Sequence, residues 1–477
     1  MLFNSLEYAL FLPVVFFLYW FLPFPHHRAQ NALLLFASYI FYGWWDWRFL
    51  SLIFISSLVD YVVAQNISRS KNRKKRQYLL GASLAVNLGF LGFFKYFNFF
   101  ADSLQDALNV VGWNVDAITL NIILPVGISF YTFQTMAYTI DVYRGRQEPT
   151  HDMIAFFAFV SFFPQLVAGP IERAKNLLPQ FTQPRHFDAY QATDGLRQIL
   201  WGLFKKIAIA DSCAVFVNDI FNNVSYYSGS TLLLGLVLFA FQIYGDFSGY
   251  SDIAIGTARL FGFELMQNFA TPYFSRDIAE FWRRWHISLT TWFRDYVYIP
   301  LGGSRGNKWQ QIRNTFIIFA VSGLWHGANW TFIVWGLLNA LYFLPLLLLN
   351  KNRAHLDVVA RGKLFPNLKD IGQILVTFLL INFSWIFFRA SSLSQAWLYV
   401  QGLFSSSLFA LPQIDIGFLS IFIVILLIAE WLQRDKQHAL QFPPLLPRPL
   451  RWGFYYMVIG ALILAQNEPQ TFIYFQF

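Results

Sequence analysis

The most reactive group that the sequence offers is a histidine within an apolar stretch. His326 lies in the almost uncharged segment 315–335. An ionisable side chain at membrane depth is costly and by default marks a functional position. In such surroundings an imidazole is expected to stay uncharged, and a neutral imidazole near pH 7 is a competent general base. His326 is therefore the first candidate for a catalytic residue.

A base of this kind suits the transfer of an acyl group to a hydroxyl. Direct attack of an acceptor hydroxyl on an activated acyl donor needs a base, an oxyanion donor and a positioned substrate. No Ser-His-Asp spacing is evident and Cys213 is the one cysteine, so the sequence offers no clear nucleophile for self-acylation. Metal ligation by His326 with His286 and aspartates is a second hypothesis. A purely structural histidine is a third.

Residues near His326 suggest how its ring is held. On a continuous helix, Asn329 lies on the same face, three residues further along. We expect it to fix the tautomer of the ring by a hydrogen bond, directly or through water, or to contact substrate. Gly323 and Gly327 are expected to leave room for a substrate beside the ring.

A second histidine belongs to a basic, tryptophan-rich helix predicted over residues 276–296. Ser275 is expected to cap this helix, and apolar side chains recur along it at helical spacing. His286 stands beside this apolar stripe and is expected to face the protein. The alternative is a surface anchor lying in the membrane interface, with His286 as a hydrogen-bonded core residue. Three arginines on the polar face are candidates for holding phosphates: Arg283, Arg284 and Arg294.

Two aspartates in an apolar region are further candidates for the site. Asp246 and Asp252 flank the segment 247–251, which is rich in small residues. Carboxylates in apolar surroundings must be paired, protonated or hydrated. The aspartates either line a cavity and contact substrate, or mark a break in the helix where small residues pack closely. Three basic residues are the expected partners: Arg173, Lys205 and Arg283.

The composition sets the class of protein that carries these residues. Of 477 residues, 56% are hydrophobic and 13% are charged, whereas soluble domains contain about 25% charged residues. Apolar windows long enough to cross a membrane recur along the chain, and they are apolar at consecutive positions, unlike the strands of a barrel. We therefore predict an all-α polytopic membrane protein with about 11 to 14 membrane helices, some of them re-entrant or interfacial.

The net charge of +9 comes from basic loops between the spans. Lys and Arg are densest at 69–76, which is the pattern of a cytoplasmic loop next to anionic lipids. No basic and aromatic domain lies outside the membrane, so nucleic-acid binding is not expected. A single cysteine excludes an intrachain disulfide and a Cys-based metal cluster, and no bound cofactor or metal is expected.

The chain is expected to form one membrane-embedded domain over residues 1–477. The motifs fall within about 120–390, and C-terminal helices occupy 391–477. No internal repeat is visible, which weakens the hypothesis of a transporter built from inverted halves. The candidate spans lie near 6–23, 31–46, 48–65, 78–97, 119–138, 152–169, 193–211, 231–249, 252–266, 312–327, 330–349, 371–389, 416–433 and 453–467.

Several short motifs are specific when they are taken together. They are Gly127-Ile128-Ser129-Phe130, Ala168-Gly169-Pro170-Ile171, Asp246-Phe247-Ser248-Gly249-Tyr250-Ser251-Asp252, Phe281-Trp282-Arg283-Arg284-Trp285-His286-Ile287-Ser288-Leu289, Trp292-Phe293-Arg294-Asp295-Tyr296, Pro300-Leu301-Gly302-Gly303 and Gly323-Leu324-Trp325-His326-Gly327-Ala328-Asn329. With these motifs the chain resembles the membrane-bound O-acyltransferase family, in particular its bacterial branch of alginate O-acetylases. The resemblance covers roughly residues 1–390.

This resemblance implies a ring of helices around a chamber through the membrane. It places the invariant histidine of the family at His326 and the second polar residue of the catalytic pair at His286. An acyl thioester such as acetyl-CoA would approach from the cytoplasm, and an acceptor hydroxyl from the other side. Members of this branch pass acetyl groups to an extracytoplasmic partner protein, which then modifies a polysaccharide.

The leading hypothesis is an O-acetyltransferase of the bacterial inner membrane that serves an exported polysaccharide such as alginate. His326 would deprotonate the acceptor hydroxyl, and His286 would position or polarise a substrate. An enzyme of the same family with a D-alanyl carrier protein or a long-chain acyl-CoA as donor is one alternative. A proton-coupled transporter or flippase that uses the buried Asp and His residues as a relay is another.

Overall fold

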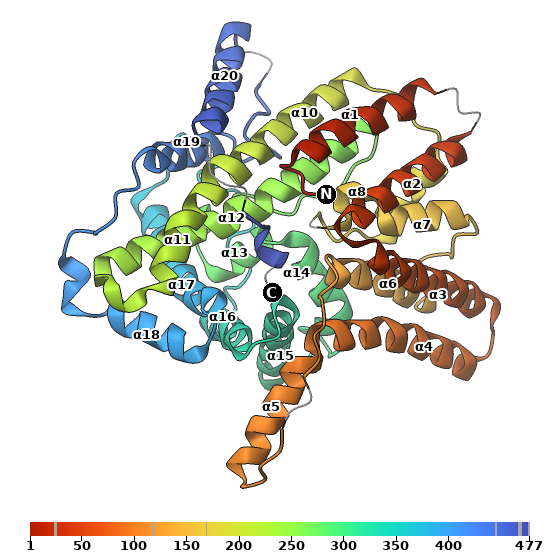
Figure 1. Cartoon of the computed structure of the whole chain (residues 1–477), viewed down its shortest axis with the longest axis horizontal. Helices are drawn as coiled ribbons and strands as arrows, with labels where there is room; N and C mark the ends of the chain where they lie inside the picture. The colour runs from red at the N-terminus through yellow and green to blue at the C-terminus, as the bar shows by residue number, and fades with distance from the viewer. Residues whose placement is uncertain (23–25, 117–118, 168, 444–445, 466–469, 476–477) are drawn as a thin grey trace. The chain divides into compact units, whose positions relative to one another are not determined.

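All regular structure in the described residues is helical, and no strand occurs among them (Figure 1). The computed structural model describes residues 1–22, 26–116, 119–167, 169–443, 446–465 and 470–475. Ala168, which belongs to one of the sequence motifs, lies outside these residues. The predicted all-α class is confirmed.

The chain divides into two compact units. The first consists of residues 1–192 and 258–265, and the second of residues 193–257 and 266–477. The single domain expected from the sequence stays a prediction. Both predicted catalytic histidines belong to the second unit.

In the first unit a buried polar cluster joins three of the helices. Asp60 on α3 accepts hydrogen bonds from Ser83 and from Asn87, the latter at 2.8 Å, both on α4. It also accepts one from Thr139 on α6 at 3.1 Å. A buried carboxylate needs such partners, and here they join three helices that lie side by side in Figure 1. The helices are α1 (Leu6–Phe21), α2 (His27–Asp46), α3 (Leu50–Arg69), α4 (Arg73–Leu91), α5 (Phe97–Val110), α6 (Ile128–Tyr143), α7 (Met153–Ser161), α8 (Phe163–Leu166) and α9 (Ala174–Thr182).

The helices of the second unit range from 7 residues in α13 and α14 to 32 in α12, the end of which belongs to the first unit. α10 (Ala189–Leu203) contributes its residues from Thr193 onward, and α12 (Gly229–Leu260) those up to Thr257. A π-helical segment, η3 (Phe204–Asp211), joins α10 to α11. The other helices are α11 (Ser212–Asn222), α13 (Ile278–Arg284), α14 (Ile287–Phe293), α15 (Lys308–His326), α16 (Trp330–Leu348), α17 (Leu368–Arg389), α18 (Leu393–Leu403), α19 (Phe418–Leu432) and α20 (Arg448–Leu464).

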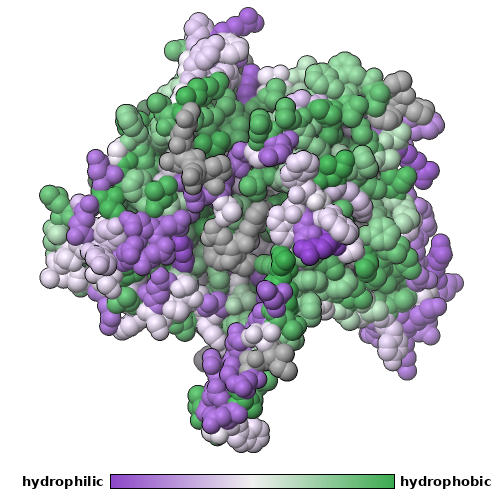
Figure 2. Space-filling view, viewed as in Figure 1, coloured by the Kyte–Doolittle hydropathy of each residue, from purple (hydrophilic) through white to green (hydrophobic). Residues whose placement is uncertain are grey.

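Five helical segments of the described chain are long and apolar enough to cross a membrane. Two shorter apolar helices, α1 and α19, accompany them. Large hydrophobic side chains are exposed along one side of α19, and Figure 2 shows broad apolar areas on the surface of the molecule. Such areas are rare on soluble monomers and fit contact with lipid. The five segments are His27–Arg69, Arg73–Val110, Gly229–Leu260, Trp330–Leu348 and Leu368–Arg389.

The break expected in the helix between Asp246 and Asp252 does not occur. α12 is continuous over 32 residues. Its small residues instead allow close approach to α10 and η3, because a Cβ added at Gly249 would lie 2.8 Å from the carbonyl oxygen of Gly202. The close packing expected there is therefore present without the break.

Candidate active site

The two histidines singled out in the sequence lie together in the second unit. The ring centroids of His286 and His326 are 6.4 Å apart. Both residues are buried, with 1% and 3% of their surface exposed. The fold thus brings two imidazoles from distant parts of the chain into one site.

His326 is the last residue of α15. This helix starts with a capping box, in which Asn307 and Gln310 bond each other's backbone N–H groups. It ends at His326 because Gly327 adopts an extended conformation. Asn329 therefore lies beyond the helix that ends at His326, so the shared helical face expected for the two residues is wrong, whereas the break between the spans predicted at 312–327 and 330–349 is present. Asn329 caps the next helix, since its side-chain oxygen accepts the N–H of Thr331 at 2.9 Å.

The side chain of Asn329 is engaged away from the histidine ring. Besides the cap, its amide nitrogen donates to the carbonyl oxygen of Ser391 at 3.0 Å. Both polar atoms of the amide therefore serve to fix the start of α16. A role of Asn329 in orienting the imidazole or in contacting substrate stays a prediction.

The glycines around His326 serve helix packing rather than substrate space. A Cβ added at Gly323 would lie 2.2 Å from the carbonyl oxygen of Phe332, and one at Gly327 would lie 2.0 Å from the Phe332 ring. A Cβ at Gly336 would lie 2.3 Å from the carbonyl oxygen of Phe319. The expectation that these glycines make room for substrate is wrong, because α16 occupies that space (Figure 1).

His286 lies at a sharp turn between two short helices. The single helix expected over residues 276–296 is wrong, because α13 ends at Arg284 and α14 begins at Ile287. Between them His286 adopts a left-handed backbone, with φ 45° and ψ 55°. Asp277, rather than Ser275, caps α13 by accepting the N–H of Glu280 at 2.7 Å.

The turn at His286 is held by the preceding loop. Asn268 accepts the backbone N–H of Ile287 at 2.9 Å through its carbonyl and the hydroxyl of Ser288 at 3.0 Å through its side chain. Its amide nitrogen donates to Ser251 on α12 at 3.2 Å. A left-handed non-glycine residue costs on the order of 1–3 kcal/mol, and such strain persists where the surroundings impose it, often at active sites.

Aromatic rings surround His286. Its ring centroid lies 4.6 Å from that of Phe247 and 5.9 Å from that of Trp325. His286 lies outside the helices identified as candidate spans. Burial among these rings lowers the pKa of His286 to about 3. The imidazole is therefore neutral near pH 7, as proton exchange with a substrate or polarisation of one requires.

Aromatic rings also enclose His326. Trp335 on α16 and Phe388 on α17 lie 5.0 Å and 5.4 Å from it, between ring centroids. The rings of Trp325 and Tyr474 lie 5.0 Å and 5.5 Å away. The ring of Tyr474 is also nearly parallel to that of His286, at 6.5 Å and 11°.

Tyr474 is one residue of this site that sequence reasoning missed. The C-terminal segment carrying it is fixed by a buried ion network, in which the backbone N–H of Ile473 donates to Asp246 at 2.6 Å. The ammonium group of Lys206 donates to the carbonyl oxygen of Gln470 at 3.0 Å. The aromatic Phe472-Ile473-Tyr474 run is visible in the sequence, but nothing in it indicates contact with the distant histidines.

Both candidate aspartates pair with lysines beneath the site. Asp252 contacts Lys205 at 2.6 Å, one of the three partners expected. Asp246 contacts Lys206 at 2.7 Å, and Lys206 also contacts Asp211 at 2.7 Å. All five side chains are nearly or fully buried, which makes the pairs necessary. Asp246 reaches the site indirectly, through the C-terminal segment.

A cavity of about 240 Å³ contains the two histidines in its wall. Trp282 and Phe319 line its apolar part, and Ser322 contributes a hydroxyl. Arg294 and Arg353 also line it, and both are exposed. The cavity thus runs from buried imidazoles to exposed guanidinium groups. Asp246 and Asp252 are not among its lining residues.

Of the three arginines expected to hold phosphates, one lines this cavity. Arg294 does so while its Nε contacts Asp295 at 2.8 Å. Arg284 is paired with buried Glu280 at 2.9 Å. Arg283 donates to the carbonyl oxygens of Asn352 and His355, at 2.9 and 2.7 Å. Arg283 therefore holds the loop that carries Arg353, which the sequence did not single out.

The described part of the chain contains no ligand set for the metal that His326 and His286 were hypothesised to bind. There, no group of three or more His, Cys, Asp or Glu side chains is arranged to hold a metal ion. Asp246 and Asp252, the candidate ligands beside His326 and His286, contact lysines instead.

Comparison with known proteins points to one family. A model of the membrane-bound O-acyltransferase family matches residues 147–386, which include both histidines. A probable alginate O-acetylase of Pseudomonas aeruginosa is 41% identical over 418 residues, 87% of this chain and 77% of that protein. The peptidoglycan O-acetyltransferase of Helicobacter pylori is 37% identical over 84% of this chain and 80% of its own length. The teichoic acid D-alanyltransferase of Bacillus subtilis is 29% identical over 46% of this chain and 58% of its own length.

Proposed function

The chain belongs to the membrane-bound O-acyltransferase family, and we propose that it moves acetyl groups from cytoplasmic acetyl-CoA to an acceptor on the other side of the bacterial plasma membrane. It is an integral membrane O-acyltransferase. The observation that carries the proposal is the cavity whose wall contains two buried imidazoles and two exposed guanidinium groups. Such an arrangement suits a thioester donor whose phosphates stay near solvent while its acyl group reaches the base.

In the proposed reaction His326 acts as the general base. The acceptor oxygen bonds to the acyl carbon while the carbon–sulfur bond breaks, and the hydroxyl proton passes to the imidazole of His326. The same imidazole then protonates the departing thiolate. His286, neutral and held by its strained turn, positions or polarises the acyl carbonyl. Apolar walls strengthen these electrostatic contacts because they exclude water.

The charge of the cavity favours an acetyl donor over a D-alanyl donor. A D-alanyl group carries an ammonium, which needs an anionic partner. No Asp or Glu lines the cavity in the described structure, whereas Arg294 and Arg353 do. These arginines are suited to the phosphates of coenzyme A, since guanidinium groups bind phosphate bidentately.

The size of the cavity favours a short acyl group. Its volume of about 240 Å³ lies below the range of roughly 300–1,000 Å³ that is usual for ligand pockets. A long acyl chain would need more space than this. Two relatives are named as acetylating enzymes for alginate and peptidoglycan. We propose an exported polysaccharide, reached through an extracytoplasmic partner protein, as the final acceptor here.

A donor panel tests the proposal. The purified full-length protein in liposomes would be given acetyl-CoA, a D-alanyl carrier protein or palmitoyl-CoA with a hydroxyl acceptor, and products would be identified by mass. We expect acetylated product from acetyl-CoA and little from the other donors. Transfer of D-alanyl or palmitoyl groups at the higher rate would change the assigned donor. Movement of intact substrate across the liposome without any donor would support a transporter instead.

A further inference from the structure

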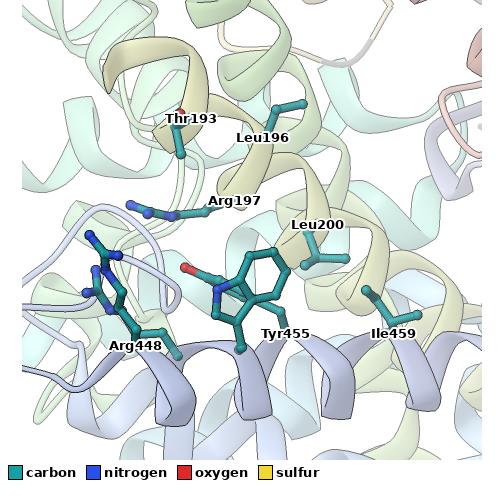
Figure 3. A pocket seen from close by; sticks show the side chains of 9 residues that line it. Thr193, Leu196, Arg197, Leu200, Arg448, Tyr455 and Ile459 are labelled. Atoms are coloured by element: carbon teal, nitrogen blue, oxygen red, sulfur yellow. The ribbon is translucent and has the colours of Figure 1, made fainter. Parts of the chain in front are cut away.

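We propose that a second cavity, between α10 and α20, binds the phosphate-bearing headgroup of an anionic phospholipid. The cavity has a volume of about 400 Å³ and lies within the second unit (Figure 3). Of the described residues, none lines both this cavity and the cavity of the two histidines. It is therefore a separate site, and nothing in the transfer reaction accounts for it.

Three guanidinium groups line this cavity. They belong to Arg197 on α10 and to Arg448 and Arg451 on α20. Within the described residues none of the three side chains forms an ion pair or hydrogen bond, and the Nε of Arg451 is buried without a partner. Among the described residues, no Asp or Glu lines the cavity. Three positive groups around one space repel one another unless an anion lies between them, and a phosphate is the anion that Arg binds best.

The neighbouring carboxylate is already engaged. Asp194 follows the lining residue Thr193, but its carboxylate contacts the buried ring of His438 at 3.2 Å. It is thus not available to neutralise the arginines. An anionic ligand would supply the compensating charge.

The opposite end of the cavity is apolar, which indicates a lipid rather than a free anion. Figure 3 shows Arg197, Arg448 and the hydroxyl of Tyr455 at one end, and Leu200 and Ile459 at the other. An inorganic phosphate would leave the leucine and isoleucine surface unused. A phospholipid satisfies both ends, because its phosphate meets the arginines while an acyl chain covers the apolar wall.

The aromatic residues and the local charge place this site at a membrane interface. Trp452 and Tyr455 line the cavity, and such amphipathic rings concentrate at the level of lipid headgroups. The chain from 433 to 451 carries four Lys or Arg residues and one Asp, the charge pattern of a cytoplasmic loop. The cytoplasmic leaflet is the anionic one, so the expected ligand is abundant there.

Lipid binding by the full-length protein tests the proposal. Wild-type protein in an uncharged detergent would be titrated with phosphatidylglycerol and, separately, phosphatidylcholine or inorganic phosphate, with bound lipid counted by native mass spectrometry. We expect one retained phosphatidylglycerol and no retained phosphatidylcholine. In the triple variant R197Q/R448Q/R451Q the affinity for phosphatidylglycerol should fall roughly 100-fold, since each basic group near a lipid surface contributes about a fivefold factor.

A charge-matched variant separates this site from general attraction to anionic lipid. R361Q/K363Q/K369Q removes three exposed charges from a loop and the start of α17 of the same unit, and it should bind as the wild type does. If the triple arginine variant does not fold, the single variant R451Q is expected to bind about fivefold more weakly. The proposal would be overturned if the loop variant lost as much affinity for phosphatidylglycerol as the arginine variants, or if the arginine variants bound it as the wild type does. Full competition by inorganic phosphate would show a free-anion site instead.

Discussion

Adding one methyl group at Gly323 should disable the enzyme without touching the histidines. A Cβ at this position would lie 2.2 Å from the carbonyl oxygen of Phe332, about 1.2 Å short of ordinary van der Waals contact. The clashing atom is backbone, so it cannot rotate away. α15 and α16 must therefore separate by about 1 Å in Gly323→Ala.

This displacement acts directly on His326, the proposed base. His326 lies about one turn after Gly323 on the same helix, and its ring packs against Trp335 on the helix that must move. A misplacement of about 1 Å typically reduces a rate by about 100-fold. Overpacking of this kind also costs about 1–3 kcal/mol of stability. We expect kcat/KM for acetyl transfer to fall roughly 100-fold, with a modestly lower Tm.

A matched glycine provides the control. A Cβ at Gly372 on α17 would meet nothing within 4 Å, so Gly372→Ala adds the same methyl group to an apolar helix without a clash. Acetyl transfer and Tm would be measured for both purified variants in the same liposomes. The reasoning is refuted if Gly323→Ala transfers acetyl groups at the wild-type rate, or if the two alanine variants lose activity equally.

Three further predictions concern the surroundings of the site. Lys206→Met leaves Asp211 and Asp246 buried without their cation, so the free energy of unfolding should drop by about 3–5 kcal/mol. An unchanged unfolding midpoint would contradict a stabilising role of this ion network. Tyr474→Ala removes a ring that contacts both imidazoles and should lower the transfer rate more than Tyr474→Phe, which keeps the ring; equal rates in the two variants would exclude this packing role. The pKa of His286 is about 3 in the folded protein and 6.5 ordinarily. Between these pH values the unfolded chain binds more protons than the folded one, so stability should decrease as pH falls through that window. The slope of Tm against pH should be shallower in His286→Gln than in the wild type, and identical slopes would argue against the buried neutral ring.

The class of fold and the choice of His326 as the candidate base follow from local features of the sequence. Apolar windows indicate membrane helices wherever they occur, and a histidine among apolar residues is conspicuous by itself. The sequence also predicts Lys205 as a partner of Asp252, because few basic residues occur in the apolar regions of the chain. Such features can be recognised without knowing which segments of the chain contact one another in the fold.

The features that were mispredicted depend on backbone conformation or on tertiary contacts. The aromatic stripe around His286 has helical spacing on both sides of the turn, so periodicity cannot reveal one residue in a left-handed conformation. A glycine at position 323 is compatible with space for a substrate and with close packing of a second helix. The position of α16 shows that the glycine serves helix packing. Tyr474 reaches the site from the far end of the chain.

The most direct test of the account is acyl transfer by His326→Ala in liposomes. Full-length protein carrying this change would be compared with wild type for acetyl transfer from acetyl-CoA, after confirming that both insert and have similar unfolding midpoints. We predict that the variant inserts normally and forms no acetylated product above the uncatalysed level. A correctly inserted variant that acetylates the acceptor at the wild-type rate would show that this imidazole is not the base.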